Sequence, residues 1–250
     1  AQYALTFDDR TATLFQGNDS IRAGKFTFSF AVPKDLHYSD ASALVNLYAV
    51  NTERTEIANG WCDKFVANGS DVADNDSIGP SIFCYLNSPA FRNGDKVNAT
   101  PYFIAEIYDE SGINATGQGI GHNMTLIIDG KTTMTYDLND SFSFDYGSYQ
   151  SGKVGYVLPT LEAGEHKLMF RSWDVLNNSS TAELSFVVDE HSMPSVYDIN
   201  VSENPVRSTA TFIVTHDRAG AQVDVEIEIY DLSGRKLATT KTTLYLKQNR

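Results

Sequence analysis

The chain has 250 residues, and its 32 acidic and 19 basic side chains give a formal net charge of -13. This charge excludes nucleic acid and an anionic membrane surface as direct partners, because a protein that binds either must neutralise phosphate with basic residues. Hydrophobic residues make up 42% of the chain and aromatic residues 12%, which excludes a disordered polymer and predicts a folded protein of one to three domains.

Neither end of the sequence carries a targeting or anchoring signal. The chain does not begin with Met, has no charged region followed by an apolar run, and nowhere contains 18 consecutive apolar residues. We therefore expect no signal peptide and no transmembrane segment in these residues. Because the sequence stops shortly after an apparent strand at 244–246, we interpret it as a fragment or processed piece of a larger protein.

Short runs rich in Val, Ile, Phe, Tyr and Thr alternate with turn-forming clusters along most of the chain, which is typical of antiparallel strands. Residues 223–229 place four aliphatic side chains on one face of a strand and three acids on the other. The expected strands are 26–30, 43–50, 81–86, 102–108, 125–128, 166–172, 182–188, 211–215 and 223–229.

Turn signals separate these strands, among them Asp129-Gly130 and Ser233-Gly234. A helical period is almost missing. The spacing predicts an all-β fold built of serial Ig-like or fibronectin-like β-sandwiches.

Two stretches predict domain boundaries. Residues 67–80 are polar, acidic and turn-forming, and the strand pattern pauses again at 189–194. Residues 1–190 carry 25 acids and 12 bases, whereas residues 191–250 carry 7 of each, so the composition also changes at the second break. We expect three modules, 1–73, 74–190 and 191–250, of which the first is partial and the last truncated.

The two cysteines, Cys62 and Cys84, favour no catalytic role, because none of the five histidines forms a local motif of a cysteine peptidase with them. Two interpretations remain open. In the first, the pair forms a disulfide that closes a loop of about 20 residues and stabilises the fold by roughly 3 kcal/mol. In the second, both cysteines are free thiols in a packed protein.

Acidic residues cluster where strands of the middle module begin or end. Carboxylate and amide oxygens at the ends of neighbouring strands can converge on Ca²⁺, although the spacing is not that of an EF-hand. The alternative is that these residues only form turns and keep the surface polar. The candidate calcium ligands are Asp74, Asp76, Asp109, Asp174 and Asn177.

Trp61 and Trp173 are the two tryptophans, and either could stack on a sugar if its ring were exposed. Packing in the core is the competing role. A carbohydrate-binding or adhesin-type surface module is therefore the alternative function for this chain.

Several short sequence motifs, in the same order along the chain, resemble those of a known family. The chain resembles the C-terminal region of PorU-type sortases of the type IX secretion system, a gingipain-like cysteine peptidase family of Bacteroidetes, and residues 191–250 are similar to its FlgD-like Ig module. The phrases include Asp109-Glu-Ser-Gly-Ile-Asn114, Gly117-Gln-Gly-Ile-Gly-His122, Leu161-Glu-Ala-Gly-Glu-His166, Ser172-Trp-Asp-Val-Leu-Asn-Asn-Ser-Ser180 and Ile227-Glu-Ile-Tyr-Asp-Leu-Ser-Gly-Arg235.

The resemblance implies a non-catalytic region of a larger peptidase or transpeptidase. No residue here matches the family's catalytic motif, so no catalytic residue and no cofactor besides Ca²⁺ are expected. The implied role is that of spacer, docking or cargo-presenting modules that bind protein partners of a secretion complex. The implied location is the outer membrane surface of a Gram-negative bacterium.

Overall fold

The computed structural model describes residues 13–34, 42–66, 75–117, 121–189, 196–201, 209–216, 222–231 and 233–245. These residues divide into two compact units, one within 1–83, 105–154 and 168–183 and the other within 84–104, 155–167 and 184–250. The strands are β1 Ala43–Val50, β2 Ile57–Phe65, β3 Ser81–Leu86, β4 Lys96–Val97, β5 Tyr102–Tyr108, β6 Thr125–Ile128, β7 Thr135–Asp137, β8 Phe142–Phe144, β9 Ser151–Val157, β10 Gly164–Trp173, β11 Ser179–Val188, β12 Val196–Val201, β13 Phe212–His216, β14 Gln222–Tyr230 and β15 Lys236–Tyr245.

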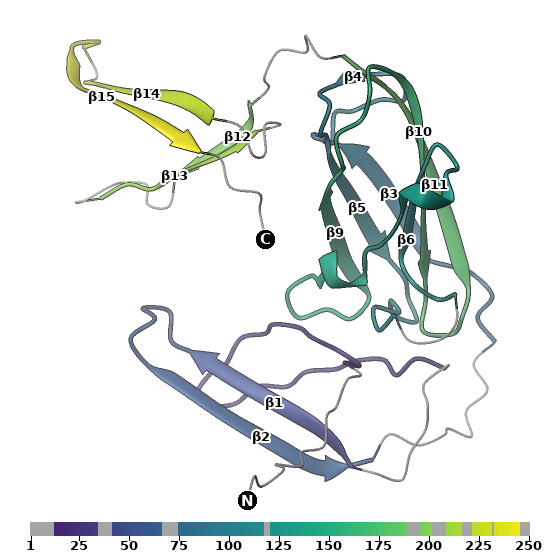
Figure 1. Ribbon diagram of the computed structural model, residues 1–250. Coiled ribbons are helices and arrows are strands. Elements are labelled where there is room, and N and C mark those ends of the chain that lie inside the picture. The colour runs from purple at the N-terminus through teal and green to yellow at the C-terminus, as the bar shows by residue number, and fades with distance from the viewer. Residues whose placement is uncertain are drawn as a thin grey trace, which may run out of the picture. The chain divides into compact units, whose positions relative to one another are not determined.

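Strands β3 to β11 form two sheets, drawn in teal and green in Figure 1. One sheet has the order β4-β11-β10-β6-β7 and the other the order β3-β5-β9-β8. The remaining strands pair in twos, β1 with β2, β12 with β13 and β14 with β15. Helical structure in the described residues is limited to two 3₁₀ turns, η1 Thr132–Met134 and η2 Asn139–Ser141. The predicted all-β fold class is confirmed.

No helix among the described residues is long and apolar enough to cross a membrane.

Buried apolar side chains come from both sheets in each unit. Alternate residues of each strand point inward, because successive side chains in a strand face opposite sides of the sheet. In the first unit, seven such side chains are at most 2% exposed: Ala105, Ile107 and Val154 from the four-stranded sheet, and Leu126, Ile128, Leu168 and Phe170 from the five-stranded sheet. In the second unit the corresponding set is Leu86 and Phe103 from the four-stranded sheet and Phe186 and Val188 from the five-stranded sheet; Leu158, which directly follows β9, is buried as well. This double set of buried faces defines a β-sandwich.

Four of the expected strands have the bounds that alternation predicted, namely β1, β3, β5 and β6. The strand expected at 26–30 is wrong, since residues 26–32 belong to no sheet. The alternation there does produce one apolar face, but among the described residues no backbone hydrogen bond joins residues 26–32 to a neighbouring strand.

The predicted turn at Asp129-Gly130 connects β6 to η1. Asp129 and Gly130 have φ angles of 53° and 65°. The amide of Lys131 donates to the carbonyl of Ile128 at 3.0 Å, which closes a four-residue turn. Asp and Gly are the residues that tolerate this left-handed backbone most readily, so the sequence signal has a direct conformational cause.

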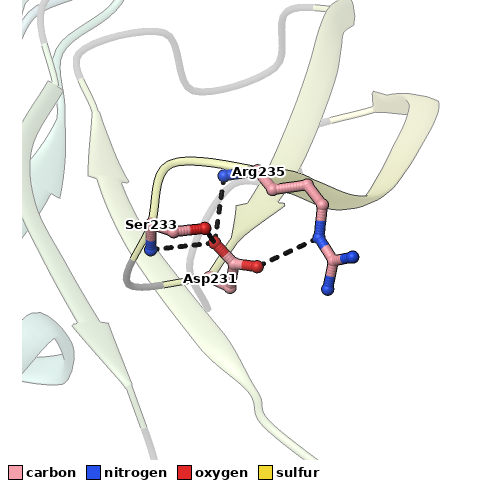
Figure 2. Close-up of polar contacts among 3 residues, drawn as sticks. All are labelled: Asp231, Ser233 and Arg235. Atoms are coloured by element: carbon pink, nitrogen blue, oxygen red, sulfur yellow. Dashed lines mark hydrogen bonds and ion pairs between the residues drawn. The ribbon is translucent and has the colours of Figure 1, made fainter.

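The predicted turn at Ser233-Gly234, between β14 and β15, is organised by one carboxylate (Figure 2). Asp231 Oδ1 accepts hydrogen bonds from the Ser233 amide at 2.9 Å, the Ser233 hydroxyl at 2.6 Å and the Arg235 amide at 3.0 Å, while Oδ2 accepts from Arg235 Nε at 3.1 Å. These bonds, led by that of the Ser233 hydroxyl, lower the pKa of Asp231.

Candidate metal centre

Three aspartates from separate segments meet in the first unit. Asp76 lies in the irregular segment before β3, Asp109 follows β5, and Asp174 follows β10. One carboxylate oxygen from each residue lies within 4.8 Å of the other two. We call this set the Asp cluster. It brings together three of the five residues that the sequence predicted as calcium ligands.

The loop backbone fixes the orientation of two of these carboxylates. Asp109 Oδ1 accepts hydrogen bonds from the amides of Ser111 at 2.8 Å and Gly112 at 3.1 Å. Asp174 Oδ1 accepts from the amides of Leu176 at 2.9 Å and Asn178 at 2.7 Å. Each Asp therefore organises the turn that follows its strand, which leaves its second oxygen, Oδ2, free of these backbone contacts.

Two residues that the predicted ligand set did not include join Asp76 to the loops. The Ser111 hydroxyl donates to Asp76 Oδ2 at 2.8 Å. The Asn178 side-chain amide donates to Asp174 Oδ2 at 2.8 Å and to the main-chain carbonyl of Asp76 at 3.2 Å. Ser111 and Asn178 thus tie the segment before β3 to the sandwich. Their only sequence signal is that each lies in the turn after a predicted strand.

The cluster is enclosed by the fold. Asp109 is 5% exposed and Asp174 is fully buried, whereas Asp76 is partly buried. Burial raises the pKa of Asp109, and the neighbouring carboxylates of Asp174 and Asp76 raise it further. The backbone amide of Ile78 and the Ser111 hydroxyl lower the pKa of Asp76 by donating hydrogen bonds to its charged form.

Among the described residues, no Lys or Arg forms an ion pair with any of the three carboxylates. Three enclosed carboxylates without a basic partner repel one another and destabilise the fold, and a bound cation would neutralise that repulsion. Ca²⁺ binds oxygen at about 2.3–2.6 Å, so two oxygens on one ion stand at most about 5 Å apart. The 4.8 Å limit of the cluster fits that distance.

The other two predicted ligands have different outcomes. Asn177 lies in the turn that Asp174 organises, with a φ of 72°, and its Oδ1 atom is buried without a described hydrogen-bond partner. This side-chain oxygen is therefore an acceptor without a described donor, three residues after Asp174 of the Asp cluster. Asp74 lies outside the described residues.

The raised pKa of Asp109 predicts a pH dependence of the metal-free protein. An acid whose pKa is higher in the folded state than its ordinary value of 3.8 contributes stability that is present at low pH and is lost as the pH rises through the folded pKa. In buffer with EDTA, the free energy of unfolding of the natural chain minus that of Asp109→Asn should therefore decrease as the pH rises from about 4. Urea denaturation at several pH values measures this difference. A difference that increases with pH contradicts the prediction.

The two tryptophans occupy different environments. Trp61, in β2, is 70% exposed. Trp173 is partly buried, its ring centroid lies 4.3 Å from that of His122, and the Arg171 guanidinium lies 5.3 Å from the ring. Because protein groups cover the Trp173 ring, the carbohydrate-binding alternative depends on Trp61.

Both cysteines are free thiols in the structure, which is the second of the two interpretations that the sequence left open. Cys84 is buried in β3, whereas Cys62 is exposed in β2. Burial raises the pKa of the Cys84 thiol to about 12. A thiol of that pKa is almost entirely protonated at neutral pH and is a poor nucleophile.

A comparison with solved structures found a chain similar to this one. The chain is similar to a crystal structure of dimeric latent PorU from Porphyromonas gingivalis, with 37% sequence identity and a TM-score of 0.53. The match covers 86% of this chain and 20% of that chain, so the present chain spans about a fifth of the length of its neighbour. No family model and no curated protein matches the sequence. These findings support a PorU-like fold relationship.

Proposed function

We propose that this chain is a non-catalytic β-sandwich region of a larger cell-surface protein related to type IX secretion sortases. The observation that carries the proposal is the match of most of this chain to a fifth of PorU. In this proposal the sandwich spaces the catalytic part of its parent from the outer membrane and docks protein partners or cargo. The parent polypeptide is a cysteine peptidase or transpeptidase at the surface of a Gram-negative bacterium of the Bacteroidetes.

The environment of the two thiols supports a non-catalytic role. Cys84 is 8% exposed, and its pKa of about 12 leaves little thiolate to attack a substrate. Cys62 lies on the exposed strand β2, and among the described residues no hydrogen bond joins it to a histidine that could deprotonate it.

An activity assay tests this role. The 250-residue chain is expected to hydrolyse arginyl and lysyl peptide substrates no faster than its Cys62→Ala, Cys84→Ala double variant does. The measurement is release of a fluorescent leaving group at micromolar enzyme, with a gingipain-type peptidase as positive control. Turnover that the natural chain shows and the Cys62→Ala variant loses would contradict the proposal.

A second function, calcium binding, is favoured by the Asp cluster. We propose that Asp76, Asp109 and Asp174 supply carboxylate oxygens to one Ca²⁺, with Asn177 as a further oxygen donor. The ion would fasten the segment before β3 to the loops after β5 and β10, because each of these segments provides one of the three acids. A calcium-bound sandwich end would hold that segment in one orientation, which suits a spacer.

A further inference from the structure

A shallow hollow lies on the outer face of the four-stranded sheet. Its volume is about 330 Å³, near the lower end of the range for pockets that bind ligands, so it suits a single side chain better than a large molecule. All of its lining residues belong to the first unit. We call this hollow the sheet pocket. Its lining includes Ser81 and Phe83 from β3, Glu106 and Tyr108 from β5, Lys153 from β9, and Asp145, which follows β8.

Two aromatic rings are exposed at the sheet pocket. Phe83 and Tyr108 come from neighbouring strands and are 53% and 52% exposed. Both point away from the core, because the adjacent residues Cys84 and Ile107 are buried and successive side chains of a strand face opposite sides of the sheet. The face of an aromatic ring carries partial negative charge and attracts a cation. These two rings therefore favour a positively charged ligand.

The charged groups of the sheet pocket point to the same kind of ligand. Lys153 Nζ lies 2.9 Å from Glu106 Oε1, so these two charges compensate each other. Asp145 is the third charged residue of the lining, and its carboxylate forms no hydrogen bond or ion pair with a described residue. The lining thus has two carboxylates and one ammonium group, in a chain whose net charge is -13. This charge is complementary to a cation and repels an anion.

The turn between β8 and β9 holds Asp145 in place. Its amide donates to the carbonyl of Ser151 at 2.9 Å, and its carbonyl accepts from the amide of Ser148 at 3.0 Å. The Ser148 hydroxyl accepts in turn from the Ser151 amide at 3.0 Å. Because the backbone at Asp145 is already ordered, a ligand that pairs with its carboxylate costs little further conformational entropy.

We propose that the sheet pocket binds the guanidinium group of an arginine side chain from a protein partner. The guanidinium would pair with the Asp145 carboxylate and stack on the ring of Phe83 or Tyr108, which its planar shape allows and the ammonium group of lysine does not match. This proposal deepens the docking role proposed above and rests on it. Its failure would leave the spacer role intact, and the peptidase assay tests the non-catalytic role separately.

Proton–nitrogen correlation spectra of the full 250-residue chain test the site by titration with three acetylated and amidated tripeptides. The first is glycine-arginine-glycine, the second has lysine in the middle, and the third has citrulline, whose neutral urea replaces the guanidinium. The arginine peptide should shift the amide signals of Phe83, Tyr108 and Asp145. It should half-saturate these shifts at a concentration at least about fivefold lower than either other peptide does, because only arginine combines positive charge with a planar group.

Two outcomes of this titration would overturn the proposal. The first is equal half-saturation by the arginine and citrulline peptides, which would show that charge does not matter. The second is a response of the same amide signals to the neutral disaccharide maltose with no response to the arginine peptide, which would make a glycan the occupant. Recovery of the intact arginine peptide after the titration separates binding from peptidase activity.

Variants locate the site. Asp145→Asn should weaken binding of the arginine peptide about fivefold or more and change that of the citrulline peptide less than about twofold, because only the charge is removed. Glu183→Gln, which neutralises an exposed acid in β11 of the other sheet, is the matched control and should change neither by more than about twofold. Phe83→Leu keeps an apolar side chain but removes the ring, and should weaken the arginine peptide about threefold. The dispersion of the spectra checks that each variant is folded. Unchanged affinity of folded Asp145→Asn for the arginine peptide would overturn the proposal.

Discussion

Calcium at about a hundred times its dissociation constant should raise the free energy of unfolding of this chain by roughly 2.7 kcal/mol, because an ion that binds only the folded state stabilises it by mass action. The Asp cluster accounts for this expectation, since its three carboxylates converge without a described basic partner. Urea denaturation with added Ca²⁺ and with EDTA measures the effect. Mg²⁺ should stabilise less, because it requires shorter bonds to oxygen and near-octahedral geometry.

The stability of Asp109→Asn relative to the natural chain should change sign between EDTA and Ca²⁺. In EDTA, Asp109→Asn should be more stable than the natural chain near neutral pH, because it removes a buried charge next to two others. With Ca²⁺, the same variant should be less stable than the natural chain, because it has lost a ligand. Asp140→Asn, which changes an exposed acid in η2, is the matched control and should respond to Ca²⁺ as the natural chain does. Equal stability of the natural chain with Ca²⁺ and with EDTA would rule out the calcium site.

Truncation of Phe170 to alanine should cost about 3–5 kcal/mol, the range typical for a buried phenylalanine. Phe170 is fully buried in β10, where it pairs in register with Leu126 of β6. That loss is a large part of the roughly 5–15 kcal/mol by which domains are stable. Because Asp174 directly follows β10, the variant should also bind Ca²⁺ more weakly.

Phe83→Ala is the control for this effect. Phe83 lies in β3 and is 53% exposed, so the same truncation should cost much less there. The measurement is urea denaturation of both variants, with the slope of the transition checked for two-state unfolding. A similar cost for Phe83→Ala and Phe170→Ala would show that burial in the sandwich does not set the stability.

Alternation in the sequence predicts strands well where one face is buried. The bounds of β5 are those predicted, because Phe103, Ala105 and Ile107 all point into the core. Strand β2 was not predicted, because its residues are largely exposed on both faces and show no alternation, and only its pairing with β1 defines it. Residues 26–32 show the opposite case, in which alternation is present but no strand in the described part of the chain pairs with them.

Part of the Asp cluster could also be predicted. Asp109 and Asp174 follow strands, and Asp76 lies in a polar linker, so their types and places in the sequence indicated an oxygen-rich site. The contributions of Ser111 and Asn178 could not be predicted, because they depend on how two turns place a hydroxyl and an amide beside Asp76. Such contacts arise from the tertiary structure and have no signature in local sequence.

The different exposure of the two thiols allows local opening of the sandwich to be measured by chemical modification. Cys62 is exposed to reagents in the folded state, whereas Cys84 is covered in β3 and stays protonated because its pKa is about 12. Modification of Cys84 therefore requires that the sheet around it open first. With Cys62 blocked in advance, the rate at which the second thiol reacts would report how often the sandwich opens, without any denaturant or introduced probe.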